Sequence, residues 1–141
     1  MEFGWELDPK LIDDGEWKPY DRFLKGFRIK LRSTRSKEFA VLLERKNAAV
    51  RAQNLKKRAR KEAFSRAFQE AIAESIIVAW DGLHDKDGAA VAYSEDFALE
   101  LMTDSKHTLL ADQIVQDAMT VGVPQLPDTD DEDEEEDSLG N

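Results

Sequence analysis

The chain has 141 residues, a length that suits one compact domain with a tail, and its apolar content of 41% is sufficient for a core. It contains no cysteine, which excludes disulfides, thiolate metal sites and cysteine nucleophiles. The net charge of −10 is unevenly distributed: residues 128–137 hold nine acids and no base, whereas residues 18–66 hold seventeen bases and four acids. Such an asymmetry is typical of a chain that binds a charged partner or masks its own charge.

The N-terminal sequence MEFGWELDPK is acidic and has no cationic region followed by an apolar run, so we expect no secretory signal. The longest apolar segment, AIAESIIVAW, is too short and too polar to span a membrane. A reducing cytoplasm is therefore the expected compartment, and a membrane is not an expected partner.

The N-terminal part of the sequence predicts a β-hairpin over residues 15–32. Apolar and basic residues alternate in FRIKLR (27–32), which gives a strand with one apolar and one cationic face. Gly26 precedes this strand and can turn the chain back on WKPYDRF. A shorter alternation at residues 3–7 is cut off by Pro9. A two-stranded hairpin is marginally stable alone, so we expect it to pack on helices.

Residues 36–80 contain neither glycine nor proline and predict helix, either as two helices with a break within 47–54 or as one long helix. An apolar stripe with a spacing of four residues gives the clearest signal, because such residues share one face of a helix. This stripe consists of Phe64, Phe68, Ile72 and Ile76. Its members are candidates for the core, or in part for a groove that accepts a partner helix.

Asp81 and Gly82 are expected to end the helix, because glycine tolerates the left-handed conformation found there. The sequence DKDG (85–88) predicts a turn, and AAVAY a short extended run. Ser94 is suited to cap the next helix, and a last helix is expected from about residue 108 to 120.

These elements indicate an α+β, mainly α fold. We expect a single globular domain over residues 1–123, with the β-hairpin at 15–32 and a small bundle of about four helices within 36–122. The remaining residues, 124–141, form a charged low-complexity segment that we expect to be a disordered acidic tail.

The loop AWDGLHDKDGAAVAYSEDF (79–97) is the main candidate for chemistry. With Gly88 at position 6 of a calcium-binding loop, position 1 falls on Leu83 and position 12 on Ser94, so two essential ligands are lacking. His107 lies far along the chain from His84, and no zinc-binding helical pair is present. Phosphate-binding and nucleophile motifs are also absent. We therefore expect no enzyme, no metal and no cofactor, and we assign the aspartates to a turn.

The run RAQNLKKRARKEAFSR (51–66) concentrates basic residues on a predicted helix. It can neutralise several phosphates, but no recognition-helix motif, RNA-binding signature or aromatic stacking platform accompanies it. A solvated face, masking by the acidic tail, a protein partner and nucleic acid are the alternatives. The residues predicted to contact a partner are Phe64, Phe68, Ile72, Ile76, Lys57, Arg58 and Lys61.

The order of these features resembles the tail assembly chaperones of long-tailed, siphovirus-type bacteriophages. The matching pieces are a helix ending in WDG (80–82), the DG turn at 87–88, an extended run ending in YS (93–94) and the acidic helix from Glu95. Upstream, the predicted strands GEWKPY and FRIKLRS and the helix SKEFAVLLER fit the same pattern. The resemblance covers roughly residues 15 to 121 and rests on order and spacing rather than on any single piece.

The resemblance implies a non-enzymatic role in the host cell cytoplasm and absence from the mature virion. Such chaperones coat the long helical tape-measure protein before the tail tube forms around it, and tail-tube subunits then displace them. The alternative is a small nucleic-acid-binding regulator that uses the basic helix 51–66 and is masked by the acidic tail. The sequence leaves open whether the chain forms a homo-oligomer.

Overall fold

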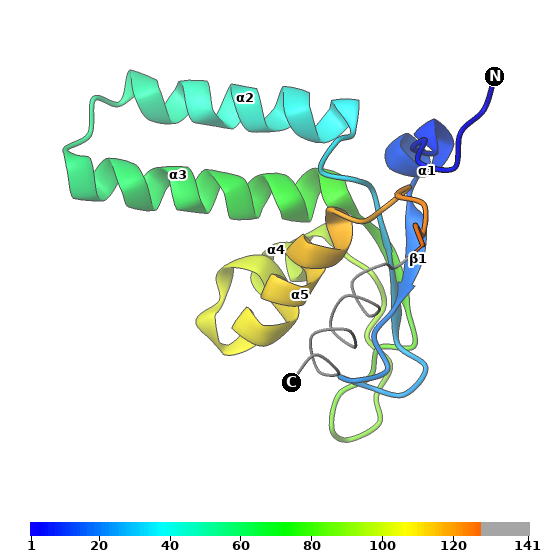
Figure 1. Cartoon of the computed structure of the whole chain (residues 1–141). Coiled ribbons are helices and arrows are strands. Elements are labelled where there is room, and N and C mark those ends of the chain that lie inside the picture. Colours follow the sequence, from blue (N-terminus) through cyan, green and yellow to red (C-terminus); the bar gives the residue numbers. More distant parts are fainter. Residues whose placement is uncertain (128–141) are drawn as a thin grey trace, which may run out of the picture.

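The computed structural model describes residues 1–127 and combines a three-stranded antiparallel sheet with helices (Figure 1). It confirms the predicted α+β, mainly α fold, in which an N-terminal hairpin precedes the helical part. Most of the predicted acidic tail, residues 128–141, lies outside the described residues.

The N-terminal segment forms no strand at residues 3–7 but contains a short helix, α1 (Pro9–Asp14). Asp8 caps this helix, since its Oδ1 accepts hydrogen bonds from the backbone N–H groups of Lys10 and Leu11. Pro9 occupies the first turn, where its missing N–H costs nothing. Pro9 thus starts a helix as well as ending the alternation seen in the sequence.

The predicted β-hairpin is present as β1 (Glu16–Pro19) and β2 (Arg28–Leu31). The two strands are antiparallel, and their register runs from Glu16 opposite Leu31 to Pro19 opposite Arg28. Ile29 and Leu31 are fully buried, whereas Arg28 is exposed and stacks over the Trp17 ring at 4.2 Å. The predicted division into an apolar and a cationic face is therefore confirmed.

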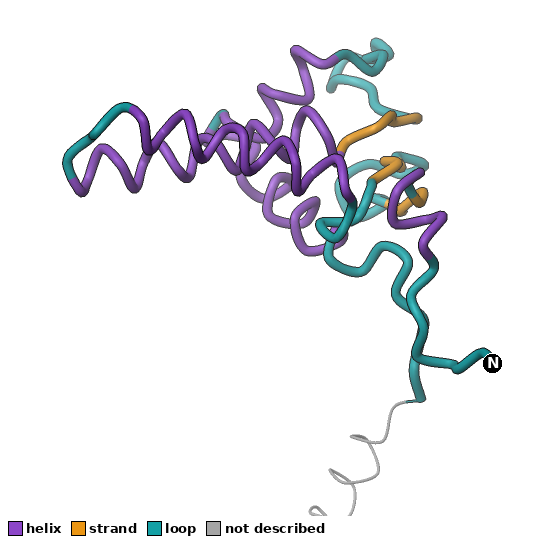
Figure 2. Tube along the Cα trace, turned by 90° about the horizontal axis from the view of Figure 1, so that it is seen from above, coloured by secondary structure: helices purple, strands orange, loops and turns teal. Residues whose placement is uncertain are grey.

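Two antiparallel helices form a helical hairpin that extends away from the sheet (Figures 1 and 2). They are α2 (Lys37–Ala52) and α3 (Lys57–Ala71), so the two-helix alternative is correct and the break falls at residues 53–56. Ser36 caps α2 by accepting a hydrogen bond from the backbone N–H of Phe39. Asn54 turns the chain with a φ of 52°.

The prediction that this helix continues to Trp80 is wrong. Helix α3 passes through a π-helical segment, η1 (Ile72–Ile76), directly into a third strand, β3 (Ile77–Asp81). Strand β3 pairs with β2, which becomes the central strand of the sheet. The β-branched run at 76–78 favours a strand. This strand forms hydrogen bonds with the edge of β2 that β1 leaves unpaired. Gly82 consequently ends a strand and not a helix.

Arg32 connects the helix-to-strand junction to the rest of the fold. Its backbone N–H donates to the carbonyl of Ile76 at 2.9 Å, and its guanidinium donates to the carbonyl of Ser75 at 2.9 Å. The same guanidinium donates to the carbonyl of Asp13 at the end of α1 at 2.8 Å. Backbone groups that the change from helix to strand would leave unpaired are therefore satisfied.

Helix α4 (Glu95–Thr103) begins at Ser94, whose hydroxyl accepts from the backbone N–H of Phe97 at 3.1 Å, as predicted. A short 3₁₀ turn, η2 (Ser105–His107), leads into α5 (Thr108–Ala118), which matches the predicted last helix. One core joins the sheet to these helices. Its fully buried members include Ile29, Leu31, Ile72, Ile76, Ala98, Ile114 and Val121.

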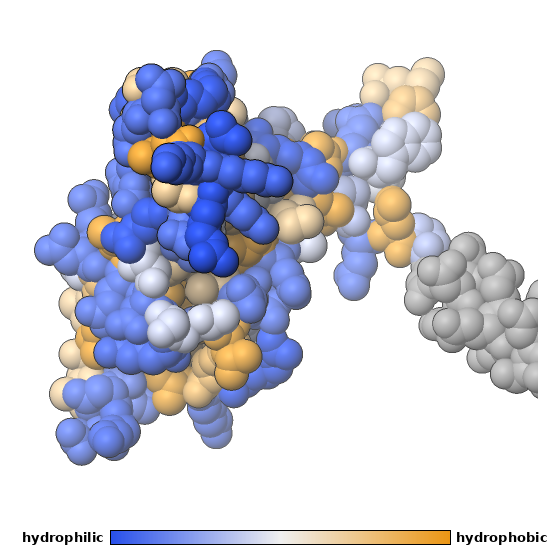
Figure 3. All heavy atoms as spheres, turned by 90° about the vertical axis from the view of Figure 1, so that its left-hand side faces the viewer, coloured by the Kyte–Doolittle hydropathy of each residue, from blue (hydrophilic) through white to orange (hydrophobic). Residues whose placement is uncertain are grey.

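The free end of the α2–α3 hairpin has a hydrophilic surface. In Figure 3 this end faces the viewer, and hydrophilic side chains cover most of it. The base of the hairpin, in contrast, packs on η1 and α4. The hairpin therefore carries an apolar end inside the core and a polar end in solvent.

We predict that Trp80→Ala lowers the free energy of unfolding by about 3–5 kcal/mol, the usual effect of emptying a large aromatic site. Trp80 is 7% exposed, and its indole N–H donates to the carbonyl of Val91 at 2.9 Å. Tyr93 and Phe97 contact its ring edge to face, with centroids 4.9 and 5.9 Å away. Urea denaturation measures the change.

Trp5→Ala is the matched control for this experiment. Trp5 is 64% exposed, so its replacement is expected to change the stability by no more than about 0.5 kcal/mol. Equal stability of the Trp80 variant and the wild type would show that Trp80 does not anchor the core.

Candidate functional site

The side chain of Asp85 stabilises the backbone of the loop that follows β3. The carboxylate of Asp85 accepts hydrogen bonds from the N–H groups of Asp87 and Ala89, both at 2.9 Å. The carbonyl of Asp85 accepts a further bond from the N–H of Gly88, whose φ of 86° suits glycine. The predicted turn is thus present, and Asp85 holds its two ends together.

No group of three or more His, Asp or Glu side chains within residues 1–127 is arranged to hold a metal ion. His84 pairs with Ala90 through its backbone in an isolated β-bridge. His107 lies on η2, where its Nε2 is 3.6 Å from Glu100 Oε2. The acidic and histidine residues of the loop are therefore dispersed and do not converge on one point.

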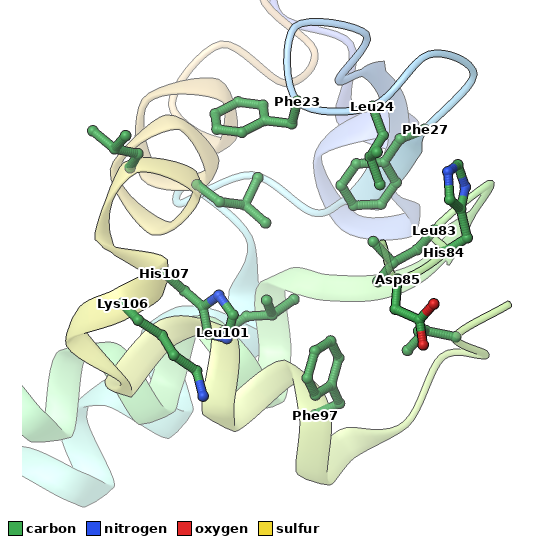
Figure 4. A pocket seen from close by; sticks show the side chains of 13 residues that line it. Phe23, Leu24, Phe27, Leu83, His84, Asp85, Phe97, Leu101, Lys106 and His107 are labelled. Carbon is green, nitrogen blue, oxygen red and sulfur yellow. The ribbon is translucent and has the colours of Figure 1, made fainter. Parts of the chain in front are cut away.

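A concave, mainly apolar surface lies elsewhere, between three separate parts of the chain (Figure 4). We refer to it as the apolar pocket. It has a volume of about 450 Å³, and its walls come from the β1–β2 turn, the loop 83–91 and the segment from α4 to α5. Its principal apolar lining residues are Phe23, Leu24, Leu83, Phe97, Leu109 and Leu110.

Leu109 stands at the opening of the apolar pocket with 81% of its surface exposed. A leucine side chain contributes roughly 1.5–3 kcal/mol when it moves from water to an apolar contact. Phe23, Phe97 and Leu110 are half-buried behind it. The pocket therefore offers an apolar surface that a partner side chain can cover with a gain in free energy.

Two of the polar residues that line the apolar pocket, Lys106 and Asp85, interact with other groups of the protein, whereas the buried Nε2 of His107 has no hydrogen-bond partner within residues 1–127. Lys106 lies 3.6 Å from Asp104, whose carboxylate also accepts from the backbone N–H of Lys106 at 3.0 Å. This backbone hydrogen bond is the main cause that lowers the pKa of Asp104. Asp85 is held by its own loop as described above. The lining is nevertheless mainly apolar, which favours apolar contact.

The structure divides the predicted apolar stripe between core and surface. Ile72 and Ile76 are fully buried on η1, so they are core residues and present no surface to a partner in this structure. Phe64 and Phe68 on α3 are half-buried, and Phe68 contacts Phe39 edge to face at 5.9 Å. The stripe is therefore mainly the packing face of the hairpin.

The predicted basic contact residues lie together at the free end of the hairpin. Lys57, Arg58 and Lys61 are exposed in the first turns of α3, beside the exposed Lys56 and Arg60. None of the five forms an ion pair with another residue of the described part of the chain. We call these five residues the cationic end. It is remote from the apolar pocket, which lies on the body of the molecule.

Sequence reasoning did not find the apolar pocket, because its residues come from segments far apart in the chain. One signal was available. Leu110, Ile114 and Ala118 are four residues apart and share the face of the helix that packs on the core. Leu109 does not lie on this face, so its side chain is directed to solvent.

Comparison with known proteins places the chain in a family. Residues 34–141, more than half of the chain, match the family described as YdaY prophage protein. The chain belongs to the YdaY prophage protein family. The match begins just before α2 and includes the hairpin, β3, α4 and α5 together with residues 128–141.

No curated protein and no solved structure matches this YdaY-family chain. Family membership therefore establishes a phage-derived origin without assigning a particular activity. Among residues 1–127, no helix has the length and apolar character needed to cross a lipid bilayer.

We predict that micromolar calcium or zinc does not raise the melting temperature, because Asp85 already uses its carboxylate to bind backbone N–H groups. Differential scanning fluorimetry with and without a chelator measures this. An increase of several degrees that Asp85→Asn removes would contradict the structural role given to Asp85.

Proposed function

We propose that this chain is a phage tail assembly chaperone that binds the tape-measure protein and is later displaced by tail-tube subunits. The role is non-enzymatic, needs no cofactor and is performed in the cytoplasm of the host cell. The observation that carries the proposal is the apolar pocket, whose mainly apolar lining suits contact with a protein partner.

The shape and lining of the apolar pocket suit an apolar side chain of a partner helix. A helix that docks on a small domain inserts anchor residues at intervals of three or four positions into such pockets. A tape-measure protein is a long helical polymer with apolar stripes, which aggregate unless they are covered. Leu109 and Phe97 supply the apolar surface to cover them.

The size of the apolar pocket agrees with reversible binding. A pocket of about 450 Å³ accepts only a few side chains, so each copy contributes a small contact. Small contacts dissociate readily, and displacement by tail-tube subunits requires this. A chain that uses many copies can still cover a long partner.

The origin of the family supports the same role. YdaY-family membership makes this a phage-derived chain. The order of motifs over residues 15–121 resembles the tail assembly chaperones. Of the pieces on which this resemblance draws, the β-hairpin and the Ser94-capped helix are present, whereas WDG (80–82) follows a strand and not a helix.

We predict that Leu109→Glu lowers capture of the co-expressed tape-measure protein at least about tenfold, because a charge at the pocket must be desolvated on binding. Pull-down of the tagged full-length chain, quantified against its input, measures the effect. The folded structure is expected to persist, since Leu109 is 81% exposed.

Met119→Glu is the matched control, because Met119 follows α5, is 53% exposed and does not line the apolar pocket. It is expected to retain capture. An equal loss of capture in both variants would show that any added negative charge has this effect. If the wild-type chain does not capture the tape-measure protein, the proposed partner is rejected.

The cationic end is the observation that favours a second candidate, a nucleic-acid-binding regulator masked by its acidic segment. For this candidate, a variant with the acids of 128–137 replaced by their amides binds DNA or RNA at low salt and loses affinity steeply as salt rises. Gel shifts at about 50 and 200 mM salt measure this.

Further replacement of Lys57, Arg58 and Lys61 by glutamate removes binding if the cationic end is the contact surface. Absence of a shift by the amide variant at the lower salt concentration excludes this second candidate.

A further inference from the structure

The cationic end combines several unfavourable electrostatic interactions. Lys57 lies one helical turn from Lys61, and Lys56 lies one turn from Arg60. Two positive charges at this spacing repel each other. All of them also lie at the N-terminus of α3, where the helix dipole disfavours positive charge. The first turn of α3 contains no acid, and Lys56 at the N-cap position makes no side-chain capping bond. Negative charge supplied from elsewhere would relieve each of these interactions.

Basic residues closer to the body, in contrast, have acidic partners. Lys46 on α2 lies 3.2 Å from Glu70 and 2.8 Å from Glu74, and the hydrogen bond with Glu74 raises the pKa of Lys46. Arg66 on α3 lies 3.0 Å from Glu70. The chain thus balances charge along the base of the hairpin and leaves it unbalanced at the cationic end.

The same chain contains a segment with the complementary charge. Residues 128–137 hold nine acids and no base, which is nearly the whole net charge of −10. Carboxylates are the natural partners of lysine and arginine side chains and of helix N-termini. Charge complementarity therefore selects this acidic segment as the occupant of the cationic end.

The path of the chain opposes docking of the segment on its own hairpin. Residues 118–122 lie beside the start of α2: the N–H of Thr34 donates to the carbonyl of Ala118, and Arg35 donates to that of Met119. Helix α2 then runs for 16 residues, roughly 24 Å, before the chain reaches the cationic end. Figures 1 and 2 both show residues 122–127 on the side of the molecule opposite to that end.

The reach of the segment is limited in comparison. A fully extended chain spans at most about 3.6 Å per residue, so roughly seven residues after Gly122 are needed to cover the length of α2. Within one copy, the acids reach the cationic end only when the residues before them are nearly fully extended, which costs conformational entropy. From a second copy, all of the acids can engage together.

We propose that the acidic segment 128–137 of one copy docks on the cationic end of the hairpin of a second copy. The contact is head to tail, because it joins two different surfaces of the same chain. A head-to-tail contact that does not close into a ring adds copies in a row. The proposal does not rest on the proposed chaperone function.

The experiment compares the full-length chain at about 0.01 M and 1 M ionic strength, between which the screening length falls from roughly 30 to 3 Å. Light scattering coupled to size-exclusion chromatography measures the mass. We expect masses above that of one chain at the lower ionic strength and a monomer at the higher one. A monomer under both conditions overturns the proposal.

Two full-length variants separate the two surfaces. The first carries Lys57→Glu, Arg58→Glu and Lys61→Glu and retains its acidic segment. The second carries the amide in place of each acid between 128 and 137 and retains its cationic end. Each alone is expected to be a monomer at low ionic strength, and an equal mixture is expected to form a one-to-one dimer and nothing larger.

A mixture that stays monomeric overturns the proposal, because the two variants together still offer one intact copy of each surface. The matched control carries Lys10→Glu, Lys25→Glu and Lys86→Glu, three exposed basic residues outside α2 and α3, and is expected to associate like the wild type. Loss of association in this control would assign the effect to net charge and also overturn the proposal. The second variant alters none of residues 1–127, so failure of the first to fold cannot hide the outcome.

Discussion

The hydrogen bonds of Arg32 hold the point at which the helical hairpin becomes the sheet. The carbonyls of Ser75 and Ile76 leave the helical pattern there, and Arg32 donates to both. An unpaired buried carbonyl costs about 1–3 kcal/mol, so the direct change from η1 to β3 depends on this residue. Everything that follows β3 depends on it as well, because the loop after Gly82 and the cap of α4 start from the position in which β3 is held. The apolar pocket is built from those later segments together with the turn that precedes β2.

The two proposed interaction surfaces differ in chemistry and lie in different parts of the molecule. The apolar pocket lies on the body and offers Leu109 and aromatic side chains. The cationic end lies at the far end of α2 and α3 and offers charge alone. Apolar contact is little affected by salt, whereas contact between exposed charges is screened by it. A change in salt concentration is therefore expected to alter the proposed association of copies and to leave the proposed binding of a partner at the apolar pocket largely unchanged.

The local pattern of the sequence predicted the elements whose stability is local. The alternation in β2, the break between α2 and α3 and the Ser94 cap each depend on neighbours along the chain. Strand β3 could not be found in this way, because Ile72 and Ile76 continue the spacing of four and only pairing with β2 turns the following residues into a strand. The apolar pocket was missed for a similar reason. Phe23, Phe97 and Leu109 come together only in the folded chain, and the outward position of Leu109 was the single local sign.

The absence of a loop between η1 and β3 has a mechanical consequence. Because α3 continues into a strand that is hydrogen-bonded to β2, the hairpin cannot swing without bending the sheet. We therefore expect the α2–α3 hairpin to behave as a rigid arm rather than as a hinged one. In a row of copies joined through such arms, stiffness would keep successive bodies at a constant spacing. The length of α2 and α3 would then act as a molecular ruler for the interval at which each body meets a rod-shaped partner.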